Sequence, residues 1–159
     1  LSELSARRTH LQRRPPDAES FDPQFVGARF GSDSAAHVER AARACGATPE
    51  LFLLACWHAL LHRITGWREV VTGVAFGGRR LEGLEALPGT FVKYLPVEAR
   101  LEAGMTFAQL LAQLGARAAV HAEWQDFFSW ENHAGPAPDA RASYLPLCFD
   151  YEDLGSPRR

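Results

Sequence analysis

The central part of the chain alternates between the apolar periods of strands and helices. Residues 70–76 form a short, nearly continuous apolar run that is rich in β-branched side chains, which predicts a strand buried on both faces. Residues 91–101 alternate instead. One face carries Phe91, Leu95, Val97, Ala99 and Leu101, and the other carries Tyr94, Glu98 and Arg100. Lys93 is the one charge on the apolar face, so its ammonium is expected to reach solvent or to face a water-filled cavity.

Three segments have the apolar period of helices. The first follows Gly31 and ends at Gly46, and its candidate N-caps are Ser32, Asp33 and Ser34. The second begins with Thr48 as cap and Pro49 at the first position, and runs to about Thr65. Its apolar residues cover most of the circumference, so we expect it to be buried rather than amphipathic. The third starts at Met105 and Thr106 and ends near Trp124.

Weaker signals complete the expected fold. Residues 25–30 are a candidate edge strand, and Leu145–Tyr151 are a candidate final strand that Pro146 limits to an edge, a bulge or a first residue. Gly77 and Gly78 end the first central strand, and a loop or short helix to Leu87 would make the two central strands a βαβ-type wall. Strands separated by helices predict an α/β or α+β layer fold, with a mixed sheet backed by helices.

Length and composition predict one domain, and the start at Leu1 without a methionine suggests a piece of a longer protein. The 159 residues are 47% hydrophobic, which suffices for a real core. The arginine-rich residues 1–20 are interpreted as a linker or strap, residues 21–155 as the domain, and residues 156–159 as a tail. The net charge of -2 argues against a nucleic-acid surface, and no apolar run approaches the length of about 20 residues that a membrane helix needs. Cys45 and Cys56 fall on apolar helix faces, which predicts buried thiols in a reducing cytosol.

Three short motifs resemble those of the condensation domains of nonribosomal peptide synthetases. Residues 73–79 resemble the family's strand that begins at a glycine and ends at an arginine, here Arg79. Residues 89–96, GTFVKYLP, resemble Gly-x-Phe-Val-Asn-x-Leu-Pro, with Lys93 in place of asparagine. Gln125 and Asp126 resemble the centre of His-Gln-Asp-aromatic-Pro-Phe-Glu, with Trp124 in place of histidine. The resemblance covers roughly residues 25–152 and points to the C-terminal lobe of such a domain.

The resemblance implies a lobe of the chloramphenicol acetyltransferase-like fold. It also implies a part in antibiotic or other secondary-metabolite biosynthesis in the cytoplasm, where amide bonds form between acyl and aminoacyl groups on carrier proteins. The expected partners are the N-terminal lobe and acyl or peptidyl carrier proteins, and the phosphopantetheine would belong to those carriers, with no cofactor bound directly. An apolar surface left by the absent lobe would favour self-association.

The catalytic histidine of the family lies in a His-His-x-x-x-Asp-Gly motif of the N-terminal lobe. None of the six histidines here has a histidine neighbour, so the fragment alone is expected to be inactive and no catalytic residue is assigned. The resemblance places four residues at the tunnel or lobe interface: Arg79, Lys93, Phe91 and Tyr94. It gives five others a structural role: Gly73, Gly89, Pro96, Gln125 and Asp126.

Several alternatives stay open at this stage. Arg79 would make a cross-lobe ion pair or lie solvated in a loop, and Lys93 would line the tunnel, tune a histidine or reach solvent at a strand end. The departures at Lys93, Trp124 and Phe128–Trp130 suggest a non-catalytic condensation-like module that recruits a carrier protein or tailoring enzyme. A stand-alone acyltransferase needs a histidine followed four residues later by aspartate, which no histidine here has. His58 and His62 have zinc-ligand spacing but no evident third ligand, so packed helix histidines are preferred over a metal site.

Overall fold

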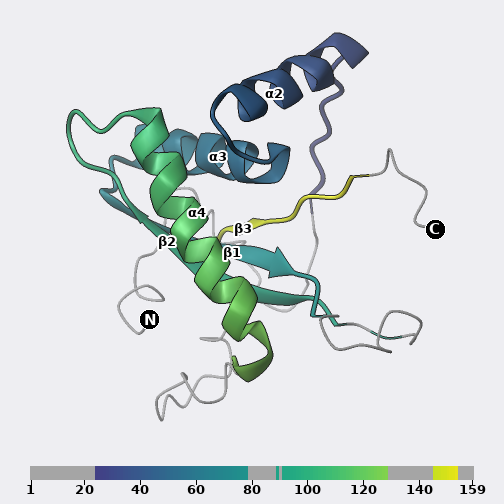
Figure 1. The fold of residues 1–159 in the computed structure, drawn as a ribbon, viewed down its shortest axis with the longest axis vertical. Coiled ribbons are helices and arrows are strands. Elements are labelled where there is room, and N and C mark those ends of the chain that lie inside the picture. Colours follow the sequence, from purple (N-terminus) through teal and green to yellow (C-terminus); the bar gives the residue numbers. More distant parts are fainter. Residues whose placement is uncertain (1–23, 79–88, 90, 129–144, 154–159) are drawn as a thin grey trace.

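A computed structural model describes residues 24–78, 89, 91–128 and 145–153 (Figure 1). Its elements in chain order are α2 (Ser32–Ala44), α3 (Pro49–Thr65), β1 (Glu69–Phe76), β2 (Lys93–Arg100), α4 (Phe107–Trp124), the 3-10 helix η1 (Gln125–Phe127) and β3 (Cys148–Phe149). Figure 1 shows α4 lying across β1 and β2, with α3 against α4 and α2 against α3. The predicted mixed sheet backed by helices is therefore confirmed.

The ends of α3 and α4 follow from local capping. Thr48 Oγ1 accepts a hydrogen bond of 3.2 Å from the Leu51 amide, and Gly66 ends α3 in the left-handed conformation with φ 72°. At α4, Thr106 and Gln109 form a capping box. The predicted cap Thr48 and the predicted start of a helix at Thr106 are confirmed. The cap predicted for α2 was wrong: Gly31 occupies the N-cap without a side-chain bond, and Ser32, Asp33 and Ser34 already lie inside the helix.

The sheet has the strand order β2-β1-β3. β1 and β2 pair antiparallel from Glu69 opposite Arg100 to Phe76 opposite Lys93, whereas β3 pairs parallel to β1, with Gly73 opposite Cys148. The prediction of a βαβ-type wall was therefore wrong. Antiparallel neighbours need no crossover helix between them.

One face of this sheet forms the core with the helices. Leu95, Val97 and Ala99 on β2 are buried together with Val70 and Val74 on β1. Val97, Ala99, Val70 and Val74 form one cluster with buried leucines of α3 and α4, namely Leu54, Leu61, Leu110, Leu111 and Leu114. The alternation predicted for β2 is confirmed. β1 is not buried on both faces, because Val71 and Ala75 on its other face are only half-buried.

The described residues expose more apolar surface than the sequence predicted. Leu60 and Ile64 on α3 are 47% and 56% exposed, and all three cysteines are exposed. The predictions of an all-round buried helix and of buried thiols were wrong, because α4 and the sheet cover only part of α3. The candidate edge strand at residues 25–30 is extended but forms no strand, and its Phe25 is 93% exposed.

The helices in the part of the chain that the structure describes differ in length and in hydropathy. No single helix there is both long and apolar enough to cross a membrane. Residues 33–44 of α2 and the whole of α3 meet that criterion only as a pair, and the two helices are bent by 93° at the break between them.

Candidate functional site: a junction of three motif segments

The turn after β1 is held by the end of α4. Gly78 has φ 61°, a conformation that favours glycine. A Cβ atom at Gly78 would collide with the backbone carbonyl of Phe91. The segment just before β2 therefore leaves no room for a side chain at Gly78. The amide of Gly78 donates a hydrogen bond of 3.0 Å to Oε1 of Gln125. The first motif segment is thereby tied to a residue that lies 47 positions later.

Lys93 begins β2 opposite Phe76, on the face that β2 turns towards the helices. Its Nζ donates to the carbonyl oxygens of Gln125 at 3.2 Å and Asp126 at 3.3 Å. Carbonyls at the C-terminal end of a helix carry partial negative charge and have no partner within the helix. The lysine on the apolar face therefore reaches the end of α4, where its charge complements the helix dipole.

Gln125 connects the three motif segments. It is only 4% exposed, and both ends of its side-chain amide are used. Oε1 accepts from Gly78, and Nε2 donates to the carbonyl of Ala122 at 2.8 Å. Its backbone carbonyl accepts from Lys93. We call the set Gly78, Lys93, Gln125 and Asp126 the motif junction. A buried amide with both groups satisfied has one defined orientation, so the junction fixes the end of β1 against the start of β2.

The remaining motif glycines mark close approaches of the backbone. A Cβ atom at Gly73 would lie 3.0 Å from the Leu145 side chain and 3.2 Å from Sγ of Cys148, because Gly73 pairs with Cys148 where β3 lies beside β1. At Gly89, φ is 154° and a Cβ atom would lie 3.1 Å from the Phe91 ring. Phe91 itself is half-buried. These small residues let the strands and the aromatic ring approach each other.

Tyr94 lies on the opposite face of β2 from Lys93. Its hydroxyl donates a hydrogen bond of 3.2 Å to Oδ2 of Asp150, in the segment after β3. Partial burial and the neighbouring Asp150 carboxylate raise the pKa of the Tyr94 hydroxyl. The phenol therefore stays protonated and acts as a hydrogen-bond donor that links β2 to the far side of the sheet.

Pro96 lies close to His121 on α4. Burial lowers the pKa of the His121 ring, the Pro96 backbone carbonyl raises it, and the positive charge of Arg117 lowers it. A proline on β2 removes one amide from the outer edge of the strand.

Aromatic residues continue from the motif junction along the outer side of α4. The rings of Trp124 and Phe127 lie 5.7 Å apart. These two side chains are 56% and 78% exposed, and Val120 one turn before Trp124 is 55% exposed. Large apolar side chains gathered at such exposure make this part of α4 and η1 a candidate interaction surface. Arg79, Arg80 and Trp130 lie outside the described residues.

The two helix histidines considered as zinc ligands lie in different surroundings. His58 is fully buried, and burial lowers its pKa from 6.5 to about 4. His62 pairs through Nδ1 with the carbonyl of Trp67 at 2.5 Å. Within the described residues, no group of three or more histidine, cysteine or acidic side chains could hold a metal ion.

Sequence reasoning found Lys93, Gln125 and Asp126 but not what joins them. Lys93 precedes Gln125 by 32 positions and Asp126 by 33. No periodicity predicts that a lysine on a strand reaches the end of a helix so much later in the chain. It also missed the amide of Gly78 and the carbonyl of Ala122, since backbone groups carry no sequence signal of their own.

Comparison with known proteins gives the family. Residues 3–127 match the condensation domain. Surfactin synthase subunit 2 of Bacillus subtilis (strain 168) is 35% identical over 98 residues, which are 62% of this chain and 3% of that protein. Phosphinothricin tripeptide synthetase PhsC of Streptomyces viridochromogenes is 43% identical over 69 residues, which are 43% of this chain and 6% of that protein.

Solved structures agree with this match. The first condensation domain of the CDA synthetase is 26% identical and superposes with a TM-score of 0.60, covering 71% of this chain and 24% of that one. The condensation domain from the Monacolin K polyketide synthase MokA is 27% identical with a TM-score of 0.57, covering 70% and 26%. The chain thus spans a few per cent of the synthetases it matches and about a quarter of the solved chains. With a match over residues 3–127, the chain belongs to the condensation-domain family.

Proposed function

We propose that this chain is the C-terminal lobe of a condensation domain that forms amide bonds in nonribosomal peptide synthesis in the cytoplasm. Residues 21–155 would form the lobe, with residues 1–20 as a linker or strap and residues 156–159 as a tail. The family match, the helix-backed mixed sheet and the three motif segments support this assignment. The share of about a quarter of the solved condensation-domain chains also fits one part of a larger domain.

In the proposed reaction, the amine of a carrier-tethered aminoacyl group attacks the thioester carbonyl of a second carrier-tethered acyl group. The new C–N bond forms as the C–S bond breaks, and the phosphopantetheine leaves as a thiolate. The proton lost by the amine goes to a base, which we assign to the N-terminal lobe, and from that base to the thiolate. This lobe contributes a fixed wall that positions the tethered groups and excludes water. The partners would be that N-terminal lobe and acyl or peptidyl carrier proteins.

The observation that carries the proposal is the motif junction. The lysine and the buried glutamine bring all three motif segments to one place, at the end of β1, the start of β2 and the end of α4. Three motifs that lie far apart in sequence and share hydrogen bonds are expected where a domain builds a site rather than a general core.

We assign Arg79, Lys93, Phe91 and Tyr94 to the tunnel or lobe interface. Arg79 lies outside the described residues, and in the sequence it directly follows Gly78, whose amide Gln125 binds. Lys93 has three N–H groups, of which two bind carbonyl oxygens, and its third would serve a group in the tunnel. The exposed Trp124 and Phe127 fit a surface covered by the other lobe.

Reconstitution tests this proposal. This chain would be combined with a cognate N-terminal lobe and two loaded carrier proteins, and the condensed thioester would be detected by mass spectrometry. We expect product only when both lobes are present. Product from this chain without the N-terminal lobe would overturn the assignment, as would its absence when both lobes form a stable complex with loaded carriers.

The second candidate is a non-catalytic condensation-like module that recruits a carrier protein or a tailoring enzyme. Lys93 favours it, because two backbone carbonyls already bind the ammonium that stands where the family has asparagine. The Lys93→Asn variant separates the two functions in the reconstituted domain. If the domain is catalytic, the family residue should preserve or raise amide formation. If the module only recruits, both forms should bind the carrier and neither should give product.

A further inference from the structure

The outer edge of β2 is covered by side chains of α4. Within the described residues β2 is the outermost strand, because the sheet order is β2-β1-β3. The amide of Leu101 donates to the carbonyl of Arg68 on the β1 side. In an antiparallel pair, backbone groups of alternate residues point to opposite sides. The N–H and C=O groups of Tyr94, Glu98 and Arg100, with the C=O of Pro96, therefore point away from β1.

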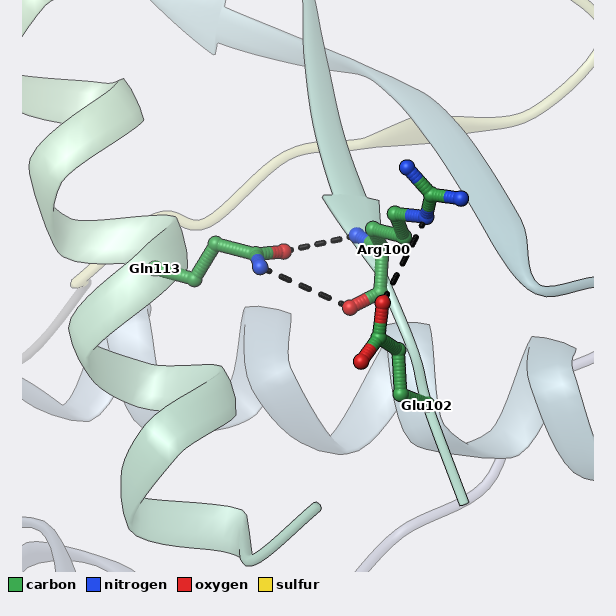
Figure 2. Close-up of polar contacts among 3 residues, drawn as sticks. All are labelled: Arg100, Glu102 and Gln113. Carbon is green, nitrogen blue, oxygen red and sulfur yellow. Dashed lines mark hydrogen bonds and ion pairs between the residues drawn. The ribbon is translucent and has the colours of Figure 1, made fainter.

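Gln113 occupies the hydrogen-bonding position at the end of this edge. Its Oε1 accepts from the amide of Arg100 at 2.6 Å, and its Nε2 donates to the carbonyl of Arg100 at 3.5 Å (Figure 2). One side-chain amide thus takes the donor and the acceptor that a neighbouring strand would take.

The edge that Gln113 covers is complementary to itself. If two copies of β2 pair antiparallel about a twofold axis at Ala99, Glu98 of each copy lies opposite Arg100 of the other. Both residues then exchange backbone hydrogen bonds, and their opposite charges face each other on one side of the ribbon. Pro96, which has no amide to donate, falls outside this central pair. In the single chain, Arg100 instead contacts Glu102, with Nε 3.7 Å from Oε1 (Figure 2).

We propose that the Glu98–Arg100 edge of β2 is a strand-addition site for a second copy of this chain, and that Gln113 keeps it closed. Unpaired strand edges are sites of unwanted association, and covering them with a helix is one way to prevent it. Gln113 does so at the position where the charges would match. The inference concerns self-association and does not depend on the proposed function.

Hydrogen exchange of the Arg100 amide tests the closed state. In the wild-type chain this amide should exchange at least about tenfold more slowly than in Gln113→Ala, whereas the Ala99 and Leu101 amides, which point to β1, should be unchanged. Glu123→Ala on the exposed side of α4 is the control. An Arg100 amide that exchanges equally fast in the wild type and in Gln113→Ala would overturn the proposal. If Gln113→Ala loses protection at Ala99 and Leu101 as well, Gln113→Met is used, since methionine keeps the length of the side chain and removes both hydrogen bonds.

Sedimentation velocity tests the open edge. Gln113→Ala should self-associate with a dissociation constant at least about tenfold lower than that of the wild type. Adding Glu98→Arg places like charges opposite each other and should reverse this gain, and adding Arg100→Glu as well should restore it. A Gln113→Ala chain that associates no more than the wild type overturns the site. If adding Glu98→Arg does not weaken the self-association of Gln113→Ala, the contact does not lie at this edge of β2.

Discussion

Acidification tests the consequence of burying His58 in the core. The side chain is fully buried on α3 with the apolar residues Leu54 and Leu61. Neither ring nitrogen has a hydrogen-bond partner among the described residues. Burial lowers the His58 pKa from 6.5 to about 4, because the charged ring loses its hydration. The folded chain therefore keeps this histidine uncharged at neutral pH.

The sign and size of the effect follow from the two pKa values. Below pH 6.5 the His58 ring is protonated in the unfolded chain. In the folded chain it becomes protonated only near pH 4. The free energy of unfolding therefore keeps its full value above pH 6.5 and falls as the pH drops towards 4. Each unit of pKa shift corresponds to about 1.4 kcal/mol, so the loss approaches about 3 kcal/mol at the acid end. That is a large part of the 5–15 kcal/mol of a typical domain.

Urea unfolding between pH 7.5 and 4.5, followed by the fluorescence of the four tryptophans, measures this loss. His58→Leu removes the titrating ring and keeps an apolar side chain. Burial also shifts the pKa values of Glu50 and His121, so the quantity to compare is the difference between the wild type and the variant at each pH. The exposed His37, changed to Gln, is the control for removal of one histidine.

The wild type should lose up to about 3 kcal/mol more than His58→Leu across this pH interval. The argument is refuted if the two proteins lose stability in parallel. It is also refuted if nuclear magnetic resonance shows that the His58 ring of the folded chain is protonated at pH 6, since the burial would then carry no such penalty.

Three further predictions concern the motif junction and the helix caps. Gly78→Ala should destabilise the chain by more than about 2 kcal/mol, because φ is 61° and the new Cβ would collide with the Phe91 carbonyl. Gly77→Ala is the control, since a Cβ atom there meets open space. Thermal unfolding of the two variants measures the difference. Lys93→Met should lower the free energy of unfolding in urea by about 1–2 kcal/mol through the loss of two hydrogen bonds to the end of α4, and wild-type stability would contradict the bonding described. Thr106→Ala should lower it by about 1 kcal/mol and speed hydrogen exchange in the first turn of α4, while Thr106→Ser should do neither.

Local sequence determined the helices and the central strands. The caps Thr48 and Thr106 and the terminator Gly66 act within a few residues of their own position, so their effect can be read directly from the sequence. The alternation of β2 and the motif at residues 89–96 identified a strand with one apolar face and a lysine on it. The family resemblance rested on the same short segments, which is why it was confirmed.

Tertiary packing decided what periodicity could not. An apolar helix face is buried only if another element covers it, so Cys56 and Leu60 on α3 are exposed although the pattern predicted burial. The strand pairing was also set by the fold. The apolar residues of β1 do not show that β2 is its antiparallel neighbour and β3 its parallel neighbour, nor that Val71 and Ala75 stay half-buried.

In the candidate site, the sequence identified the residues and only the fold shows the contacts between them. The sequence marked Lys93 and Gln125 as members of two separate motifs, and only the folded chain shows that the ammonium of one binds the backbone carbonyl of the other. The Gln125 side chain in turn holds the amide of Gly78. Backbone carbonyls and amides are present at almost every position, so which of them meet a given side chain is set by how α4 lies on the sheet, and sequence alone does not contain that geometry.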